Sequence, residues 1–463
     1  MSGRPLLNFS LAVNYAISGE AVWSYHALNL LIHICAGLTL FGVVRQTLSG
    51  FVGAQTCCDL EEDGRSKPAP LQRDATLLAC AVALLWMLHP LLTESVTYIT
   101  QRCESLMGLF YLLTLYGFIR SVTAESRNCW LVLSIAACCC GMATKQVMVT
   151  APVLVLLYDR TFVSGSFRTA LANRRWYYAG LAATWLWLGF LMHRSSLAAI
   201  HIGFQAGGSW QTYAMTELCV VTNYLRLAFW PHPLVFDYGV EIMVTDPLTA
   251  APYALIIGAI LAGVGIACWR APKVGFLGCW FFLFLAPTST VVPIGGEPMA
   301  ESRMYLPLAA VVALVVTGVY ARFGRRSLVL WPVLAVGLGW LTYVRNEAYG
   351  SDIALWRDTV AKMPRSARAR YNLSMVYSKQ GQYAQAVVED EVGLQLDSWA
   401  SAEQAPAAHN KLGYDLAELG RMPEAVAHYE QAFLPQSSHR VSVSRARCCP
   451  ALAPPERRTC GGA

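Results

Sequence analysis

Three residues beside long apolar segments carry side chains that could take a proton from a hydroxyl. They are Glu94, Glu301 and His89. A carboxylate close to lipid is costly unless it has a function, and a carboxylate or imidazole near a hydroxyl can act as a general base. We therefore take these three as the candidate catalytic residues, with His89 as a polar residue lining the same site.

Five further residues could hold a phosphate group, and they also fall at the ends of apolar segments. They are Arg4, Arg102, Lys145, Arg303 and His26. Arg and Lys side chains at headgroup depth bind phosphate oxygens through charge-assisted hydrogen bonds. Together with the nearby carboxylates, they indicate an enzyme that takes a group from a lipid phosphate and acts outside the cytoplasm.

Several of these residues also have a purely structural interpretation. Arg102 can serve as a headgroup anchor at a span end, and Glu104 can simply pair with it. His33, which shares an expected helix face with His26, can make an interhelical hydrogen bond. His89 and the following proline can mark a helix end. Glu94 and the Glu301 segment are the hardest to explain in this way, because an acid near lipid is costly without a role.

The composition places these residues in a polytopic membrane protein. Charged residues make up 14% and hydrophobic residues 55% of the 463 residues, whereas a soluble domain carries about 25% charged residues. This excludes a disordered chain and argues against an ordinary soluble enzyme. A bilayer core of about 30 Å requires roughly 20 helical residues, and ten segments approach that length. They are 24–48, 74–90, 104–121, 128–144, 146–162, 176–194, 250–268, 274–294, 304–321 and 327–345.

The distribution of Lys and Arg predicts the orientation of these spans. If residue 24 lies outside, fifteen Lys and Arg residues fall in the inner loops and span ends and six fall in the outer loops of the membrane part, as the positive-inside rule requires. This topology requires that 209–235 lie on or dip into the outer face without crossing the membrane. The candidate site and the region after residue 346 are then extracytoplasmic.

The polar region after residue 346 contains two related segments. Five positions recur at an offset of 39, as the pairs Leu373 and Leu412, Tyr377 and Leu416, Gly381 and Gly420, Tyr383 and Met422, and Ala386 and Ala425. This pattern is typical of tetratricopeptide repeats, in which the glycine lies at the turn between two helices. Pro423 suits the first turn of a helix. We expect an all-α fold with a membrane domain over 1–346, a repeat domain over 347–434 and an irregular tail over 435–463, which is disordered or mispredicted.

Five ordered blocks of the sequence resemble the transmembrane and tetratricopeptide-repeat-containing O-mannosyltransferases and their bacterial relatives. The blocks are RPL…YHALNLLIH, LHPLLTESVTYITQRCESLMGLFYLL, MATKQVMVTAPVLVLLYD, YLRLAFWPHPLVFDY and AESRMYLP, followed by the repeats. The resemblance covers roughly residues 4–433.

This resemblance implies a C-type glycosyltransferase (GT-C-like) membrane fold and an activity. Such enzymes take a sugar from a polyprenyl phosphate, usually mannose from dolichyl phosphate in eukaryotes, and transfer it to Ser or Thr of proteins. The lipid-linked sugar is a donor substrate, so no cofactor is expected, and the metal requirement stays open. The expected partners are the membrane, the lipid-linked sugar and an acceptor protein in the repeat groove, but no nucleic acid. The repeats would lie in the endoplasmic reticulum lumen or the bacterial periplasm.

Two departures from the family pattern favour an alternative. The family begins with a further helix and an outer loop that carries an acid, whereas no acid lies between Met1 and Gly19, and the far C-terminal repeats are also missing. We expect either a gene model that starts late or an inactive chain. The alternative function is a catalytically inactive, membrane-anchored repeat scaffold for protein–protein interaction.

Overall fold

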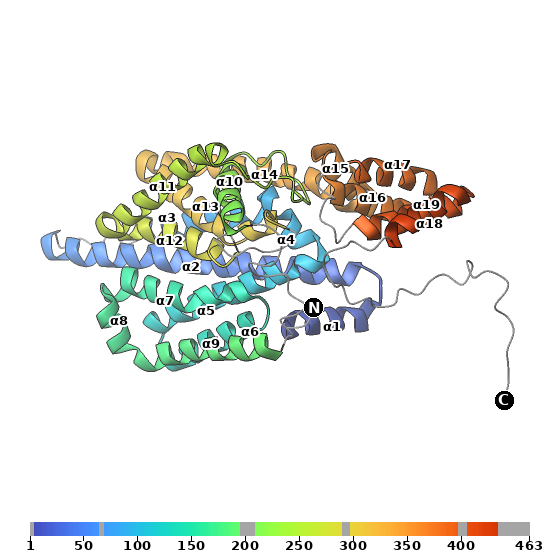
Figure 1. Cartoon of the computed structure of the whole chain (residues 1–463). Helices are drawn as coiled ribbons and strands as arrows, with labels where there is room; N and C mark the ends of the chain where they lie inside the picture. The colour runs from blue at the N-terminus through green and yellow to red at the C-terminus, as the bar shows by residue number, and fades with distance from the viewer. Residues whose placement is uncertain (1–3, 64–68, 195–208, 289–296, 397–404, 434–463) are drawn as a thin grey trace, which may run out of the picture. The chain divides into compact units, whose positions relative to one another are not determined.

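The described residues of the computed structural model are 4–63, 69–194, 209–288, 297–396 and 405–433 (Figure 1). Within these ranges the chain forms helices and no β-strand, so the predicted all-α class is confirmed. The helices up to residue 347 are α1 (Pro5–Ser18), α2 (Trp23–Asp63), α3 (Ala69–Met87), α4 (Thr93–Thr97), α5 (Arg102–Thr123), α6 (Arg127–Met142), α7 (Ala151–Asp159), α8 (Phe167–Asn173), α9 (Arg175–Arg194), α10 (Trp210–Phe229), α11 (Pro247–Arg270), α12 (Pro272–Leu285), α13 (Pro307–Phe323) and α14 (Leu330–Glu347).

Short helical turns connect several of these elements, and five helices follow. The turns are η1 (Pro90–Leu92), η2 (Ile99–Gln101), η3 (Gln146–Thr150), η4 (Arg160–Ser164), η6 (Glu301–Met304), η7 (Gly324–Val329) and η8 (Ala348–Gly350). The later helices are α15 (Asp352–Lys362), α16 (Ala367–Lys379), α17 (Tyr383–Leu394), α18 (Ala405–Glu418) and α19 (Met422–Phe433).

Each of the ten segments that the sequence suggests as spans contains a helix, although residues 289–294 of the segment 274–294 lie outside the described residues. Five helical stretches of the described chain are long and apolar enough to cross a membrane, and a sixth qualifies if a bent pair counts as one span. The five are Trp23–Gly50, Ile99–Thr123, Gln146–Ser164, Pro247–Arg270 and Pro307–Gly350. A multi-pass membrane protein is therefore supported, while the count of ten stays a prediction.

The core of the membrane part forms around α2. This helix packs against α3 on one side and α5 on the other, and it runs between two groups of helices (Figure 1). The core side chains include Trp86, Tyr111, Phe118 and Tyr158, all at most 4% exposed. Burial of such large aromatic groups fixes the helices that carry the candidate site.

The segment 209–235, expected at the outer face, begins with the helix α10. Its buried side chains recur at intervals of three or four residues, as Tyr213, Thr216, Glu217, Val220, Val221, Tyr224 and Leu227. One face of α10 therefore packs on the protein, which is the pattern of an amphipathic helix. Its placement at the outer membrane face stays a prediction.

The two predicted repeat segments each form a pair of helices. Gly381 joins α16 to α17 with φ of 73°, and Gly420 joins α18 to α19 with φ of 77°. Such left-handed turns favour glycine, so the predicted role of both glycines is confirmed. Pro423 lies in the first turn of α19, as expected. The tetratricopeptide assignment itself stays a prediction.

Contacts divide the chain into two compact units, Met1–Ser398 and Trp399–Ala463. The first unit includes α15, α16 and α17 together with the membrane helices. The expected boundary at 346 therefore stays a sequence-based prediction. The expected tail over 435–463 lies outside the described residues.

Candidate functional site

A bend in the chain positions Glu94. The residue before a proline favours extended backbone, and His89 has φ of −76° and ψ of 126°. The segments Arg73–Met87 and Pro90–Thr97 consequently meet at 54°. The imidazole of His89 stabilises this bend, because its Nδ1 accepts the Leu91 amide at 3.2 Å and its Nε2 donates to the Ala228 carbonyl at 3.2 Å.

The two candidate acids lie on neighbouring segments. Glu94 Oε2 accepts a hydrogen bond from the Ser302 amide at 3.0 Å, so this acid binds the residue that follows Glu301. Ser95 Oγ donates to the Ser302 carbonyl at 3.3 Å and links the same two segments. Glu94 is 4% exposed and Glu301 is 2% exposed. Residues far apart in the sequence thus form one buried acidic centre.

Glu301 is held by two hydrogen bonds and carries a shifted pKa. Its Oε1 accepts from the Val235 amide at 2.6 Å and from the Tyr238 hydroxyl at 2.8 Å. Burial raises the pKa of Glu301 from 4.5 to about 7, although the charges of Arg345 and Lys362 and both hydrogen bonds oppose this rise. A carboxyl with a pKa near neutrality can exchange protons at physiological pH.

Three of the candidate phosphate ligands belong to a second, charged cluster beside this centre. Lys145 forms an ion pair with Glu104, and Arg303 lies 3.9 Å from the carboxylate of Glu217. Glu104 and Arg303 line one small cavity. Arg4 is close enough that its charge, with that of Lys145, acts on the nearby Cys103. With three basic and two acidic groups, the cluster has an excess of positive charge.

Arg303 is also fixed by backbone carbonyls. Its guanidinium donates to the carbonyls of Glu297 at 2.5 Å, Pro298 at 2.9 Å and Thr288 at 3.3 Å. These bonds hold the chain between Glu297 and the start of η6, which carries Glu301. The positions of the acid and of Arg303 are therefore coupled through one short segment.

Arg102 serves a different purpose in the structure. It is fully buried, and its three guanidinium nitrogens donate to Asn29 Oδ1 at 2.5 Å, to the Ser10 carbonyl at 3.2 Å and to the Tyr25 carbonyl at 3.0 Å. Arg102 therefore joins α1, α2 and α5. It does not pair with Glu104, contrary to the structural alternative considered from the sequence.

The two histidines of α2, His26 and His33, differ in their burial. His33 is buried and hydrogen bonds the Tyr305 hydroxyl at 2.9 Å and the Met87 carbonyl at 3.1 Å, which confirms an interhelical role. His26 is exposed, although it was expected to share a helix face with His33.

A polar cavity of about 220 Å³ opens beside Glu94, and most of its residues were not among the sequence candidates. Its lining includes Glu94, Tyr98, Gln101, Asp237, Trp356 and Arg368. Asp237 and Arg368 form an ion pair. Phe236 packs edge-on against Tyr98 and Trp356, with centroid distances of 4.9 and 5.2 Å. Carboxylates and aromatic rings together suit a ligand that has hydroxyl groups on an apolar frame.

Arg345 was also missed from the sequence, because it looks like an ordinary anchor at the end of an apolar segment. It is 8% exposed, donates to Asp358 at 2.7 Å and lies over the Tyr349 ring at 5.3 Å. Lys362 donates to the same Asp358 at 2.7 Å and to the Leu234 carbonyl at 2.8 Å. Helix α15 thereby supports the segment that binds Glu301.

No three His, Cys, Asp or Glu side chains within the described ranges converge as a metal site would require. The described residues do offer carboxylates for proton transfer and basic groups for an anion. This arrangement can support attack by a hydroxyl and departure of a phosphate.

Comparison with known proteins supplies relatives that cover most of this chain. No family model and no solved structure matches the chain. Protein O-mannosyl-transferase TMTC4 of Mus musculus is 24% identical over 442 residues, which cover 83% of this chain and 57% of that protein. TMTC1 of Homo sapiens is 23% identical over 85% of this chain and 48% of that protein. Tmtc3 of Drosophila melanogaster is 24% identical over 95% of this chain and 53% of that protein.

The chain spans about half the length of these relatives. The resemblance of its sequence blocks is confirmed at the level of distant homology. The chain is a distant homologue of the protein O-mannosyl-transferases.

Proposed function

We propose that this chain transfers a sugar, mannose, from a polyprenyl phosphate to Ser or Thr hydroxyls of proteins on the extracytoplasmic side. The observation that carries this proposal is the pairing of two buried acids, Glu94 and Glu301, with the charged cluster around Arg303. The relatives are named protein O-mannosyl-transferases, which supports the sugar and the protein acceptor.

The proposed reaction is a substitution at the anomeric carbon. The acceptor hydroxyl attacks that carbon and forms the new C–O bond while the C–O bond to the lipid phosphate breaks. Glu301 or Glu94 takes the hydroxyl proton, and the departing phosphate carries the electron pair. A pKa of about 7 suits Glu301 for this role, because a base works best when its pKa is near the working pH.

Arg303, Lys145 and Arg4 are the proposed phosphate contacts. Positive groups fixed before the reaction stabilise the charge that develops on the leaving phosphate. Arg102 and His89 are proposed to position the site, because the nitrogens of both side chains already bind protein groups. His26, exposed at the start of α2, would face the lipid headgroups.

The finer architecture belongs to the same proposal. It comprises ten spans in a GT-C-like arrangement over 1–346 and tetratricopeptide repeats over 347–434, which hold the acceptor in their groove. The cavity beside Glu94 is lined by Trp356 of α15 and Arg368 of α16. An acceptor segment bound along these helices would reach the acid directly.

One observation favours the alternative of a non-catalytic scaffold. The ammonium group of Lys145 is paired with Glu104, and these side chains are only 13% and 4% exposed. A phosphate must compete with Glu104 for this lysine. If it cannot, the chain would serve only as a membrane-anchored repeat scaffold for protein–protein interaction.

The test uses the full chain in nanodiscs, supplied with dolichyl phosphate mannose labelled in the sugar and with an acceptor protein. We expect Glu301→Gln to lower turnover by about 10²–10⁴-fold, the usual contribution of a general base. Glu125→Gln is the matched control, because this acid is exposed between α5 and α6. Full activity in both Glu94→Gln and Glu301→Gln would refute the catalytic assignment, and no turnover by the unmodified chain would favour the scaffold.

A further inference from the structure

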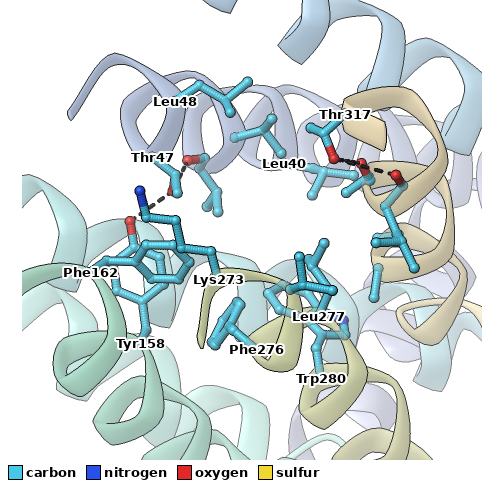
Figure 2. A pocket seen from close by; sticks show the side chains of 17 residues that line it. Leu40, Thr47, Leu48, Tyr158, Phe162, Lys273, Phe276, Leu277, Trp280 and Thr317 are labelled. Carbon is cyan, nitrogen blue, oxygen red and sulfur yellow. Dashed lines mark hydrogen bonds between the residues drawn. The ribbon is translucent and has the colours of Figure 1, made fainter. Parts of the chain in front are cut away.

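An apolar cavity of about 250 Å³ lies between α2, α7, α12 and α13, separate from the acidic centre (Figure 2). Seventeen residues line it, and most are aliphatic or aromatic. On α2 the lining runs from Leu40 to Leu48, which spans about 12 Å at 1.5 Å per residue. The cavity is therefore long enough for part of an extended hydrocarbon chain.

Small residues keep this space open, and two exposed residues mark its edge. Ala309, Ala310 and Ala313 line it from α13, where larger side chains would fill it. Val274 is 47% exposed and Leu314 is 43% exposed, although both line the cavity. In a membrane-spanning bundle, these exposed apolar residues face the hydrocarbon of the bilayer.

One end of the cavity is polar. The side chains of Lys273, Thr47 and Tyr158 lie together at that end, while Leu277 and Trp280 lie at the other (Figure 2). The hydroxyls of Thr47 and Tyr158 hydrogen bond at 2.7 Å, and the Thr47 hydroxyl also donates to the Val43 carbonyl at 2.7 Å. Lys273 thus provides a positive charge where the cavity meets the ends of the helices.

The charges around this end favour an anion. Arg45, Arg160 and Arg270 each lie within three residues of a lining residue. The neighbouring acid, Asp159, is compensated by Arg174 at 3.1 Å and by the Tyr178 hydroxyl at 2.7 Å. The positive charge of Lys273 at this end of the cavity suits a phosphate group.

The contents of the cavity follow from its chemistry. An empty space of this size loses the dispersion contacts of the residues that line it, and water gains nothing from an apolar wall. A lipid chain restores those contacts. We infer that the cavity binds one hydrocarbon chain of an anionic phospholipid whose phosphate lies at Lys273.

The sugar donor is a poorer candidate for this cavity. Trp280 lies seven residues after Lys273, or about 10 Å along α12, and its indole N–H donates to the Leu306 carbonyl at 3.0 Å. Arg303 is three residues before Leu306. The proposed donor phosphate at Arg303 is thus beyond the Trp280 end, opposite to Lys273. The inference does not depend on the proposed transferase activity.

The experiment is native mass spectrometry of the full chain released from nanodiscs of equimolar palmitoyl-oleoyl phosphatidylglycerol and phosphatidylcholine. We expect one phosphatidylglycerol to stay bound. Ala313→Leu should lose it, because the added side chain fills the cavity. Ala259→Leu, on the exposed face of α11, is the matched control and should keep it. Lys273→Gln should lower the preference for phosphatidylglycerol about five-fold, the effect of one Lys near an anionic surface, whereas Arg226→Gln should not.

Three results would overturn the inference. In the first, the unmodified chain retains both phospholipids equally. In the second, folded Ala313→Leu retains phosphatidylglycerol as well as the unmodified chain does, and Lys273→Gln keeps the same preference for it. In the third, undecaprenyl phosphate displaces the bound lipid. Lys273 is exposed, so its replacement tests the headgroup contact even if Ala313→Leu fails to fold.

Discussion

Replacing Glu301 by Gln removes one titrating group and leaves its hydrogen bonds possible. The Gln side-chain oxygen can still accept from the Val235 amide and the Tyr238 hydroxyl, which are 2.6 and 2.8 Å from Oε1 in the structure. The variant therefore isolates the effect of the carboxyl's proton from the effect of its contacts.

The sign of the expected effect follows from the raised pKa of Glu301. Its pKa is about 7 in the folded chain and near 4.5 when exposed. Between these values the folded state keeps a proton that the unfolded state has lost. Stability from this group is therefore fully present below pH 4.5 and is lost as the pH rises through 7. The shift corresponds to about 3 kcal/mol at 1.36 kcal/mol per pKa unit.

The assay compares thermal unfolding of the unmodified chain and Glu301→Gln in one detergent from pH 4 to pH 8.5. We expect the stability of the unmodified chain, relative to the variant, to fall by about 3 kcal/mol over this range and to level off above pH 7. Glu125→Gln, an exposed acid, should show no such trend. A constant difference, or one that grows with pH, would refute the burial argument for Glu301.

Three further predictions test other parts of the structure. Gly420→Pro should unfold the α18–α19 pair, seen as lost helical signal and protease resistance, because φ of 77° is inaccessible to proline; Gly420→Asn should be tolerated better. Arg102→Gln should lower the unfolding free energy by about 3 kcal/mol, since buried charge-assisted hydrogen bonds from α5 to α1 and α2 are lost, and unchanged thermal stability would contradict this. The last prediction uses single cysteines in a background from which the reactive native cysteines have been removed. Glu297→Cys should react with an impermeant thiol reagent from outside and Arg325→Cys should not, because both positions are exposed and the predicted topology places them on opposite faces of the membrane. The reverse labelling pattern would show that 209–235 crosses the membrane.

The sequence predicted the helices better than the contacts between them. Apolar length and helical periodicity were enough to locate the segments that became α2, α5, α11 and α13, because each helix is defined by local residues. The glycine turns at Gly381 and Gly420 were found for the same reason. The bend before Glu94 was signalled only by His89-Pro90, and its angle depends on tertiary packing.

The sequence predicted the two acids of the candidate site but only some of the residues that contact them. Glu94 and Glu301 were chosen because an acid near lipid is costly, but nothing local to either residue indicates that Ser302 joins them. Arg345 was not predicted as a site residue because its role depends on Asp358, which belongs to a later helix. Contacts between distant segments are set by packing, which one sequence does not reveal.

Charged residues near lipid look alike in the sequence, but their hydrogen bonds in the structure distinguish those with a structural role from those available to a ligand. Arg102 has a protein partner for each guanidinium nitrogen, so its burial is explained without a ligand. Lys145 is compensated by a single acid, which an anion could replace. Glu301 keeps two hydrogen bonds and still has a pKa raised to about 7, so its charged form is not fully compensated. The cost of burial identifies residues that need a reason, and the raised pKa of Glu301 is why this carboxyl is one of the two acids that we propose as the general base.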